Sequence, residues 1–208
     1  IDSEAVSRVV AGISRIFEEQ GYRLLLANTE NRMDKELEYL EVFRTGNVDG
    51  VLLVATILSP AHRKAVQACS VPVVLLGQQM DRVTCVYHDA RGAAYAVTRL
   101  MLQGGRKKLG YIGVTQRDRA AGESRRAGFL DALHEAGLEE TASRMEQSDF
   151  SIDGGYAAAE RMLQRANDVD GIFCATDSIA IGAMNRLEQY GRRVPEDVAL
   201  AGIGHSRL

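Results

Sequence analysis

The residues that could carry out catalysis are scattered along this 208-residue chain. Its four histidines include no i, i+4 pair of the kind that holds zinc on a helix, and no Gly-x-Ser-x-Gly nucleophile elbow occurs. No glycine-rich phosphate loop is present, because Gly104-Gly105 follows a predicted helix rather than a strand. The three cysteines have neither metal-ligand spacing nor short-range pairing. We therefore expect a binding protein rather than an enzyme, with no metal and no cofactor.

One acidic residue stands where a ligand could be held. Asp177 follows the apolar run Gly171–Ala175, at the point where a predicted buried strand is succeeded by a helix. Open α/β sheets bind their ligands at the carboxyl ends of strands. The carboxylate of Asp177 can cap the helix by accepting backbone N–H bonds, and it can also accept hydrogen bonds from a polar guest. The sequence favours the capping role, and the ligand role depends on further evidence.

The elements that must position such a residue follow a regular alternation. Apolar residues at helical spacing are separated by short apolar runs of strand length. Continuous apolar strands between amphipathic helices are typical of parallel sheets that are covered on both faces. We therefore predict an α/β fold with doubly wound parallel sheets. The predicted strands span residues 22–27, 51–55, 71–76, 83–87, 109–114, 171–175 and 198–203.

Two strand entries resemble each other, one in each half of the chain. Val48–Leu53 reads VDGVLL, Val169–Cys174 reads VDGIFC, and each follows a predicted helix. The similarity indicates two lobes of related design, and chance likeness between apolar strands is the alternative. Two such lobes would face each other across a cleft, which is the usual place for a small ligand.

The composition is that of an ordinary soluble globule. Hydrophobic residues make up 46% of the chain and charged residues 25%, with a net charge of −3 that gives no reason to expect binding to nucleic acid or an anionic membrane. No run approaches the ~18 apolar residues of a membrane helix, and no signal peptide is visible. The odd number of scattered thiols favours a reducing compartment. We expect a cytoplasmic protein.

Four stretches of the chain share a pattern with one protein family. The longest, residues 170–204, reads DGIFCATDSIAIGAMNRLEQYGRRVPEDVALAGIG; the others are VDGVLLVAT (48–56), VPVVLLG (71–77) and SRRAGFLDAL (124–133). Together they resemble the effector-binding core of the LacI/GalR family of bacterial transcription repressors, over essentially the whole chain. Within the family, the opening residues and the loop TQRDRAAGESRR (115–126) look most like repressors of disaccharide operons, trehalose or sucrose in particular.

The resemblance implies a two-lobed, periplasmic-binding-protein-like fold of type I, incomplete at both ends, with an N-terminal lobe at residues 1–87 and a C-terminal lobe at 88–208. A sugar or sugar phosphate would bind between the lobes and control operator binding allosterically. The DNA-binding helix-turn-helix headpiece is absent and would precede Ile1, and the protein would be a homodimer. The main alternative is a periplasmic-type sugar-binding transport receptor; a sugar-modifying hydrolase is a third class.

The resemblance also assigns candidate ligand-binding residues. Arg125 occupies the arginine of the family's RxxGF motif, which holds sugar hydroxyls or an acidic group; a surface salt bridge with Glu123 or Asp131 is the alternative. Asp177 matches the aspartate of the family's ND pair and would accept bonds from sugar hydroxyls. Ser3 stands where the family often has asparagine before the first helix, as cap and cleft-facing group.

Three further candidates stand at strand ends or at departures from the family pattern. Asn28 ends the first predicted strand and either lines the cleft or occupies a turn. Gln78 follows Gly77, which replaces the family's aspartate, so an amide would substitute for the charge. His205 stands where a ligand-binding aspartate is common, as a ligand contact or an ordinary loop residue. These departures leave the identity of the effector open, and phosphorylated sugars are among the candidates.

Overall fold

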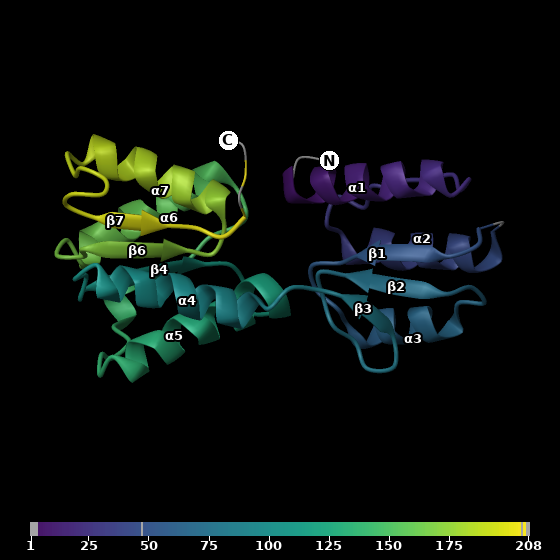
Figure 1. The fold of residues 1–208 in the computed structure, drawn as a ribbon, viewed down its shortest axis with the longest axis horizontal. Helices are drawn as coiled ribbons and strands as arrows, with labels where there is room; N and C mark the ends of the chain where they lie inside the picture. The colour runs from purple at the N-terminus through teal and green to yellow at the C-terminus, as the bar shows by residue number, and fades with distance from the viewer. Residues whose placement is uncertain (1–3, 47, 205, 207–208) are drawn as a thin grey trace. The chain divides into compact units, whose positions relative to one another are not determined.

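Parallel strands with helices packed against them form both halves of the chain, as the alternating pattern predicts. A computed structural model describes residues 4–46, 48–204 and 206 (Figure 1). The chain divides into two compact units, Ile1–His88 and Asp89–Leu208. Each unit contains its own parallel sheet and its own hydrophobic core, and each is described here by itself.

The first unit contains a parallel sheet with the strand order β1-β2-β3 in its described residues. The side chains of Val51, Leu53 and Leu75 are buried on one face, where Leu40 and Val66 from two helices pack against them. Alternate burial of this kind follows from the two-residue period of a strand. The elements are α1 (Glu4–Glu19), α2 (Met33–Thr45), β1 (Val51–Val54), α3 (Pro60–Ala68), β2 (Val73–Leu76) and β3 (Thr84–Val86).

The predicted strand at residues 22–27 is wrong. The segment is not paired with any strand in the described part of the chain, and β1 forms its ladder with β2 alone. Leu25 is 70% exposed and Leu26 is 52% exposed, so the apolar run is not in the core. An apolar sequence of strand length becomes a strand only when a neighbouring strand accepts and donates its backbone hydrogen bonds.

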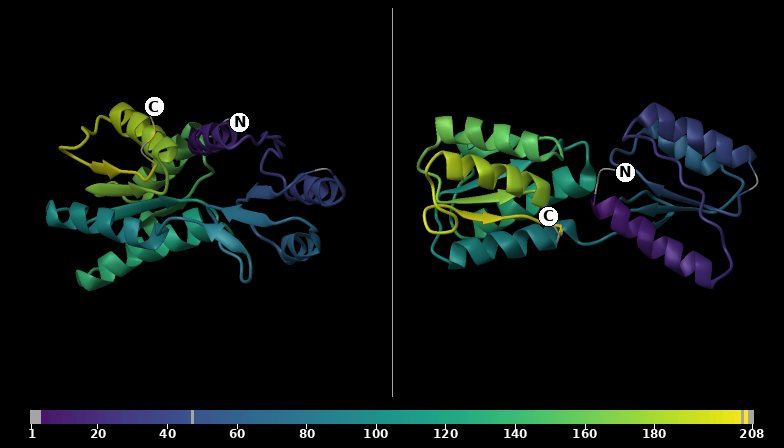
Figure 2. Two further views of the ribbon diagram at one scale, coloured as in Figure 1. Left: turned by 45° about the vertical axis from the view of Figure 1, so that its right-hand side comes forward. Right: turned by 90° about the horizontal axis from the view of Figure 1, so that it is seen from above.

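The second unit contains a parallel sheet with the order β5-β4-β6-β7 in its described residues. Helices cover both faces, with α4 and α5 on one side and α6 and α7 on the other (Figures 1 and 2). The short polar strand β5 has the sequence MEQ and was not predicted. The elements are α4 (Ala90–Gln103), β4 (Leu109–Gly113), α5 (Arg125–Glu135), β5 (Met145–Gln147), α6 (Ile152–Arg165), β6 (Gly171–Cys174), α7 (Asp177–Gln189) and β7 (Ala199–Ala201).

The core of the second unit lies around β4 and β6, both of which are buried along their full length. Three aromatic rings pack together there: Tyr111 lies 5.2 Å from Phe129 and 5.6 Å from Phe173 between ring centroids. Cys174 is also fully buried, as predicted for a small core residue, and burial raises the pKa of its thiol. All three cysteines are free thiols.

A buried polar pair joins α2 to α3 in the first unit. His62 Nε2 lies 2.9 Å from Glu36 Oε2, and both side chains are almost fully buried. The Ser59 N–H donates to His62 Nδ1 at 3.2 Å, which leaves Nε2 as the protonated nitrogen that donates to the carboxylate. Burial raises the pKa of Glu36, and the bond from His62 opposes that rise.

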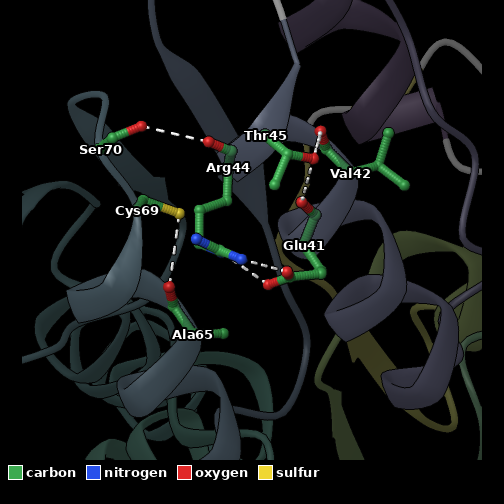
Figure 3. Close-up of polar contacts among 7 residues, drawn as sticks. All are labelled: Glu41, Val42, Arg44, Thr45, Ala65, Cys69 and Ser70. Atoms are coloured by element: carbon green, nitrogen blue, oxygen red, sulfur yellow. Dashed lines mark hydrogen bonds and ion pairs between the residues drawn. The ribbon is translucent and has the colours of Figure 1, made fainter.

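The other ends of α2 and α3 are held by hydrogen bonds across their last turns (Figure 3). The Ser70 hydroxyl donates to the Arg44 carbonyl at 3.1 Å, which ties the second residue beyond α3 to the end of α2. The Arg44 guanidinium also binds Glu41 one turn earlier, with Nε 2.8 Å from Oε2. A cation in the last turn of α2 is favourable because that end of the helix dipole is negative.

No helix in the described ranges combines the length and the apolar character needed to cross a lipid bilayer.

Candidate functional site

The carboxyl ends of β4 and β6 form the point where the connections of the second sheet diverge. After β4 the chain runs through α5 to β5 on one side of the sheet, and after β6 it runs through α7 to β7 on the other. The loops at the ends of these two neighbouring strands therefore turn away from each other. Such a switch point is where open α/β sheets leave room for a ligand.

Arg125 bridges this point. It is the first residue of α5, is 8% exposed, and donates a hydrogen bond from Nη1 to the carbonyl oxygen of Ala175, which directly follows β6. Burial lowers the pKa of the guanidinium, and the nearby charges of Asp118 and Asp177 act against that decrease. A guanidinium remains charged even so, and it offers a rigid fork of donors that suits vicinal oxygens.

The predicted alternative for Arg125, a surface salt bridge, does not hold for Asp131. That carboxylate pairs with Arg91 instead, through two bonds of 2.6 and 2.9 Å between α5 and α4. Arg125 is on the buried side of α5, and its hydrogen bond reaches the end of a neighbouring strand. The sequence motif therefore identified a residue that faces the strand edge.

Asp118 shapes the turn that leads into α5, and sequence reasoning missed it. Its buried carboxylate accepts the N–H groups of Ala120 at 3.0 Å and Ala121 at 2.9 Å, which begins the π-helical turn Arg119–Ser124. An aspartate just before a helical turn is a recognisable cap signal in sequence. By shaping this turn, Asp118 fixes the position of the first residue of α5, which is Arg125.

Asp177 is close to this edge, but it is not the helix cap that we predicted. The hydroxyl of Thr176 caps α7 by accepting the Ile179 N–H at 3.3 Å, and Asp177 is the first helical residue. The Asp177 carboxylate instead accepts the Ser206 N–H through Oδ2 at 2.7 Å. A Cβ atom at Gly204 would lie 2.9 Å from the same oxygen, so the loop after β7 approaches this closely because residue 204 has no side chain.

An aromatic side chain stands at the same edge after β5, where no candidate was predicted. Phe150 is 40% exposed in the loop between β5 and α6. The loop is held by Asp149, whose Oδ1 accepts the Ser151 N–H at 2.8 Å, and by Ser151, whose hydroxyl caps α6 through the Gly154 N–H at 2.9 Å. Hydrogen bonds from the Ser151 hydroxyl and from the Ser151 N–H lower the pKa of Asp149. An aromatic residue within a polar stretch between predicted elements is the sequence signal for Phe150.

The candidates of the first unit occupy its own loops. Gln78 follows β2 and is 6% exposed; its amide donates to the carbonyl oxygen of Thr56, which follows β1, at 3.0 Å. Asn28 is exposed, and its Oδ1 accepts the Glu30 N–H at 3.2 Å, which is the turn geometry that was one of the two predictions for it. Ser3 and His205 lie outside the described residues.

The arrangement in the second unit suits binding of a polar guest. Arg125 at the start of α5 offers donors, Asp177 at the start of α7 offers carboxylate acceptors, and Phe150 in the loop before α6 offers an apolar ring face, each beyond the carboxyl end of a neighbouring strand. Among the described residues, histidine, cysteine, aspartate and glutamate form no cluster of three or more that could hold a metal ion. The donors of Arg125 and the acceptors of Asp177 suit a molecule rich in hydroxyl or acidic oxygens.

A sequence model of the family described as "Periplasmic binding proteins and sugar binding domain of LacI family" matches residues 6–204. The chain belongs to this family. Its LacI-type pattern and its α/β fold with parallel sheets, both expected from the sequence, are thereby confirmed.

Curated relatives and solved structures agree with this membership. The chain is 34% identical over 205 residues to the HTH-type transcriptional regulator CelR of Thermobifida fusca, with 96% of this chain and 59% of the relative aligned. It is 27% identical to the HTH-type transcriptional repressor PurR of Aliivibrio salmonicida, covering 97% of this chain and 61% of the relative. The chain thus spans about three-fifths of the length of these relatives.

Two solved structures show the same fold. A CelR-cellobiose complex aligns with a TM-score of 0.87 at 30% identity, over 95% of this chain and 61% of that one. The transcription regulator CcpA of Lactococcus lactis aligns with a TM-score of 0.89 at 29% identity, over 98% of this chain and 75% of that one.

Proposed function

We propose that this chain is the effector-binding domain of a LacI-type transcription regulator, and that Ile1–His88 and Asp89–Leu208 are its two lobes. The observation that carries the proposal is the placement of Arg125 and Asp177 at the starts of the helices that follow β4 and β6, at the edge where open α/β sheets hold ligands. A sugar hydroxyl can accept from the guanidinium and donate to the carboxylate at once. This pairing favours a carbohydrate over an apolar guest.

The ligand class that we propose is a disaccharide or a sugar phosphate. A relative is described as a CelR-cellobiose complex, which makes cellobiose the first candidate, and the resemblance of residues 115–126 adds trehalose and sucrose. Ser3, Gln78, Asn28 and His205 are proposed as further contacts. Because Gln78 already donates to Thr56, its role would be to shape the loop as much as to touch the sugar.

The proposed mechanism is linkage between two sites of a homodimer. A sugar that binds one conformation better than another shifts the population toward it. That shift changes the fraction of dimers whose helix-turn-helix headpieces fit an operator. The sugar changes the affinity for DNA by the same coupling free energy by which DNA changes the affinity for the sugar. The ratio of the two affinities sets the largest shift that the sugar can cause.

The test is a thermal-shift screen of the full-length protein against cellobiose, trehalose, sucrose, their component monosaccharides and the corresponding phosphates, followed by calorimetric titration of those that raise the midpoint. Arg125→Ala and Asp177→Ala should each weaken binding by about 1.5–3 kcal/mol, because each loses charge-assisted hydrogen bonds. Arg99→Ala, which removes an exposed arginine of α4, is the matched control and should leave the affinity unchanged.

Two results would contradict the proposal. Unchanged affinity in both Arg125→Ala and Asp177→Ala would place the ligand elsewhere. Conversion of the bound sugar during prolonged incubation would indicate an enzyme rather than a regulator.

A further inference from the structure

Tyr111 carries a hydroxyl group inside a buried aromatic cluster that offers it no hydrogen-bond partner. Its side chain is 3% exposed, and its ring packs against Phe129 and Phe173, which are fully buried. Among the residues that the structure describes, none forms a hydrogen bond with the Tyr111 hydroxyl. A phenylalanine would fill the same space without burying an unpaired polar group, which is unfavourable.

The hydroxyl lies toward the carboxyl end of β4. A Cβ atom at Gly113 would be 2.3 Å from Tyr111 Cε1 and 2.8 Å from its hydroxyl oxygen. The ring therefore extends along the strand and covers Gly113, which is the last residue of β4. The absence of a side chain at position 113 allows the phenol to reach the strand edge.

The Arg125 guanidinium also lies at the carboxyl-end edge of β4 and β6. Ala175 continues β6 alongside β4, since its N–H donates to the Ile112 carbonyl at 2.8 Å, and its own carbonyl oxygen accepts from Arg125. Arg125 is also one turn before Phe129 on α5, so both side chains occupy one face of the helix. Phe129 contacts the Tyr111 ring, so the ring lies along the face of α5 that carries Arg125.

The electrostatics agree with this placement. Burial raises the pKa of the Tyr111 phenol, and the charge of Arg125 is the largest influence that opposes the rise. The phenol therefore stays protonated, and its oxygen can accept from a guanidinium N–H while its O–H donates to an acceptor oxygen.

We propose that Tyr111 is a positioning residue of the effector site, whose hydroxyl orients the Arg125 guanidinium toward a hydroxyl or phosphate oxygen of a bound sugar. The proposal rests on the proposed function. In the bound state the phenol oxygen accepts from one guanidinium N–H, and the remaining N–H groups of Arg125 are thereby directed to oxygens of the sugar. Tyr111 thus raises the affinity for oxygen-rich ligands through Arg125, without a contact of its own with the ligand.

The decisive variant is Tyr111→Phe in the full-length protein. Without sugar, its resistance to urea should equal or exceed that of the wild type, because the removed hydroxyl has no partner in the described structure. In titrations with cellobiose, trehalose and sucrose, the affinity for whichever sugar the wild type binds should fall by about three- to tenfold. In an Arg125→Ala background the same change should have no further effect, because the hydroxyl acts through the guanidinium.

Tyr156→Phe provides the matched control, since the Tyr156 hydroxyl donates to Gln189 Oε1 at 2.6 Å between α6 and α7. This variant should lose some resistance to urea and keep its affinity for the sugar. The proposal is overturned if Tyr111→Phe is less stable than the wild type without sugar, or if it binds the sugar as tightly as the wild type. A wild type that binds none of the three sugars would count against the proposed function as well, and the wild-type titration alone reveals that case.

Discussion

The carboxylate of Asp177 accepts the backbone N–H of Ser206 at 2.7 Å, which joins the start of α7 to the loop that follows β7. The two residues are 29 positions apart in the sequence. Because Thr176 caps the helix, the Asp177 carboxylate is available for this longer-range bond. One of its oxygens thus holds protein backbone, and under the proposed function the other would accept from a sugar hydroxyl.

Replacement of Asp177 should loosen that loop. We expect Asp177→Ala to lower the free energy of unfolding by about 1–2 kcal/mol and to speed hydrogen exchange at the Ser206 amide, because a charge-assisted hydrogen bond is lost. Asp177→Asn keeps an acceptor oxygen and should show smaller effects. Asp153→Ala removes an exposed acid from the first turn of α6 and is the control for the helix-dipole contribution. Unchanged exchange at Ser206 in Asp177→Ala would show that the bond does not hold the loop.

The packing of α6 against α7 predicts a large difference between two glycine substitutions. A Cβ atom at Gly182 would lie 2.0 Å from the Ile152 carbonyl oxygen and 2.6 Å from the Tyr156 nitrogen. Gly182→Ala should therefore destabilise the protein by about 1–3 kcal/mol, since backbone must move. Gly12→Ala in α1 meets no atom within 4 Å and should stabilise it by about 0.5–1 kcal/mol. Urea unfolding of both variants checks the prediction, and equal midpoints would contradict it.

Removal of the His62 side chain should lower the free energy of unfolding substantially. Its imidazole donates to the buried Glu36 carboxylate, so His62→Ala leaves that group without its nitrogen partner, and we expect a loss of about 3–5 kcal/mol in chemical denaturation. Glu36→Gln retains an acceptor for the imidazole and removes the charge, and should cost far less. Glu38→Gln, at an exposed position of α2, should have no effect. A His62→Ala variant as stable as the wild type would mean that the pair does not hold α2 to α3.

Asp149 should make stability depend on pH at the acidic end. Its hydrogen bonds from Ser151 lower the pKa of the carboxyl in the folded protein. The stabilisation is therefore complete above the unfolded value of about 3.9 and is lost as the pH falls through the lowered folded value. Asp149→Asn should lower the thermal midpoint at pH 7, and the difference from the wild type should shrink toward about pH 2. Asp153→Asn is the control, and a difference independent of pH would contradict the prediction.

Much of the fold could be predicted because most strands are continuous apolar runs between helices. The residues of β6 are buried along the whole strand, and its predicted range was correct to one residue. The prediction failed where a strand depends on its partners rather than on its own composition. The polar β5 forms because β4 offers a free edge, whereas residues 22–27 are apolar yet unpaired in the described structure.

The candidate site could be predicted in part. Arg125 was found because the RxxGF pattern marks the start of a helix at the strand edge, which the structure places there. Tyr111 was not predicted, since an aromatic residue in an apolar strand is typical of a core. Only the packing shows that its hydroxyl lies toward the carboxyl end of β4. The cap of α7 was misassigned by one residue, because Thr176 and Asp177 are both good caps and the backbone conformation decides between them.

The contact between α6 and α7 at Gly155 and Gly182 brings backbone against backbone within the first two turns of both helices. No flexible side chains lie between them at these points to absorb a displacement. The two helices therefore have little room to shift relative to one another at these turns. Under the proposed function, a displacement of the loop before α7 would be passed to the loop before α6, so that one bound sugar would affect Asp177 and Phe150 together.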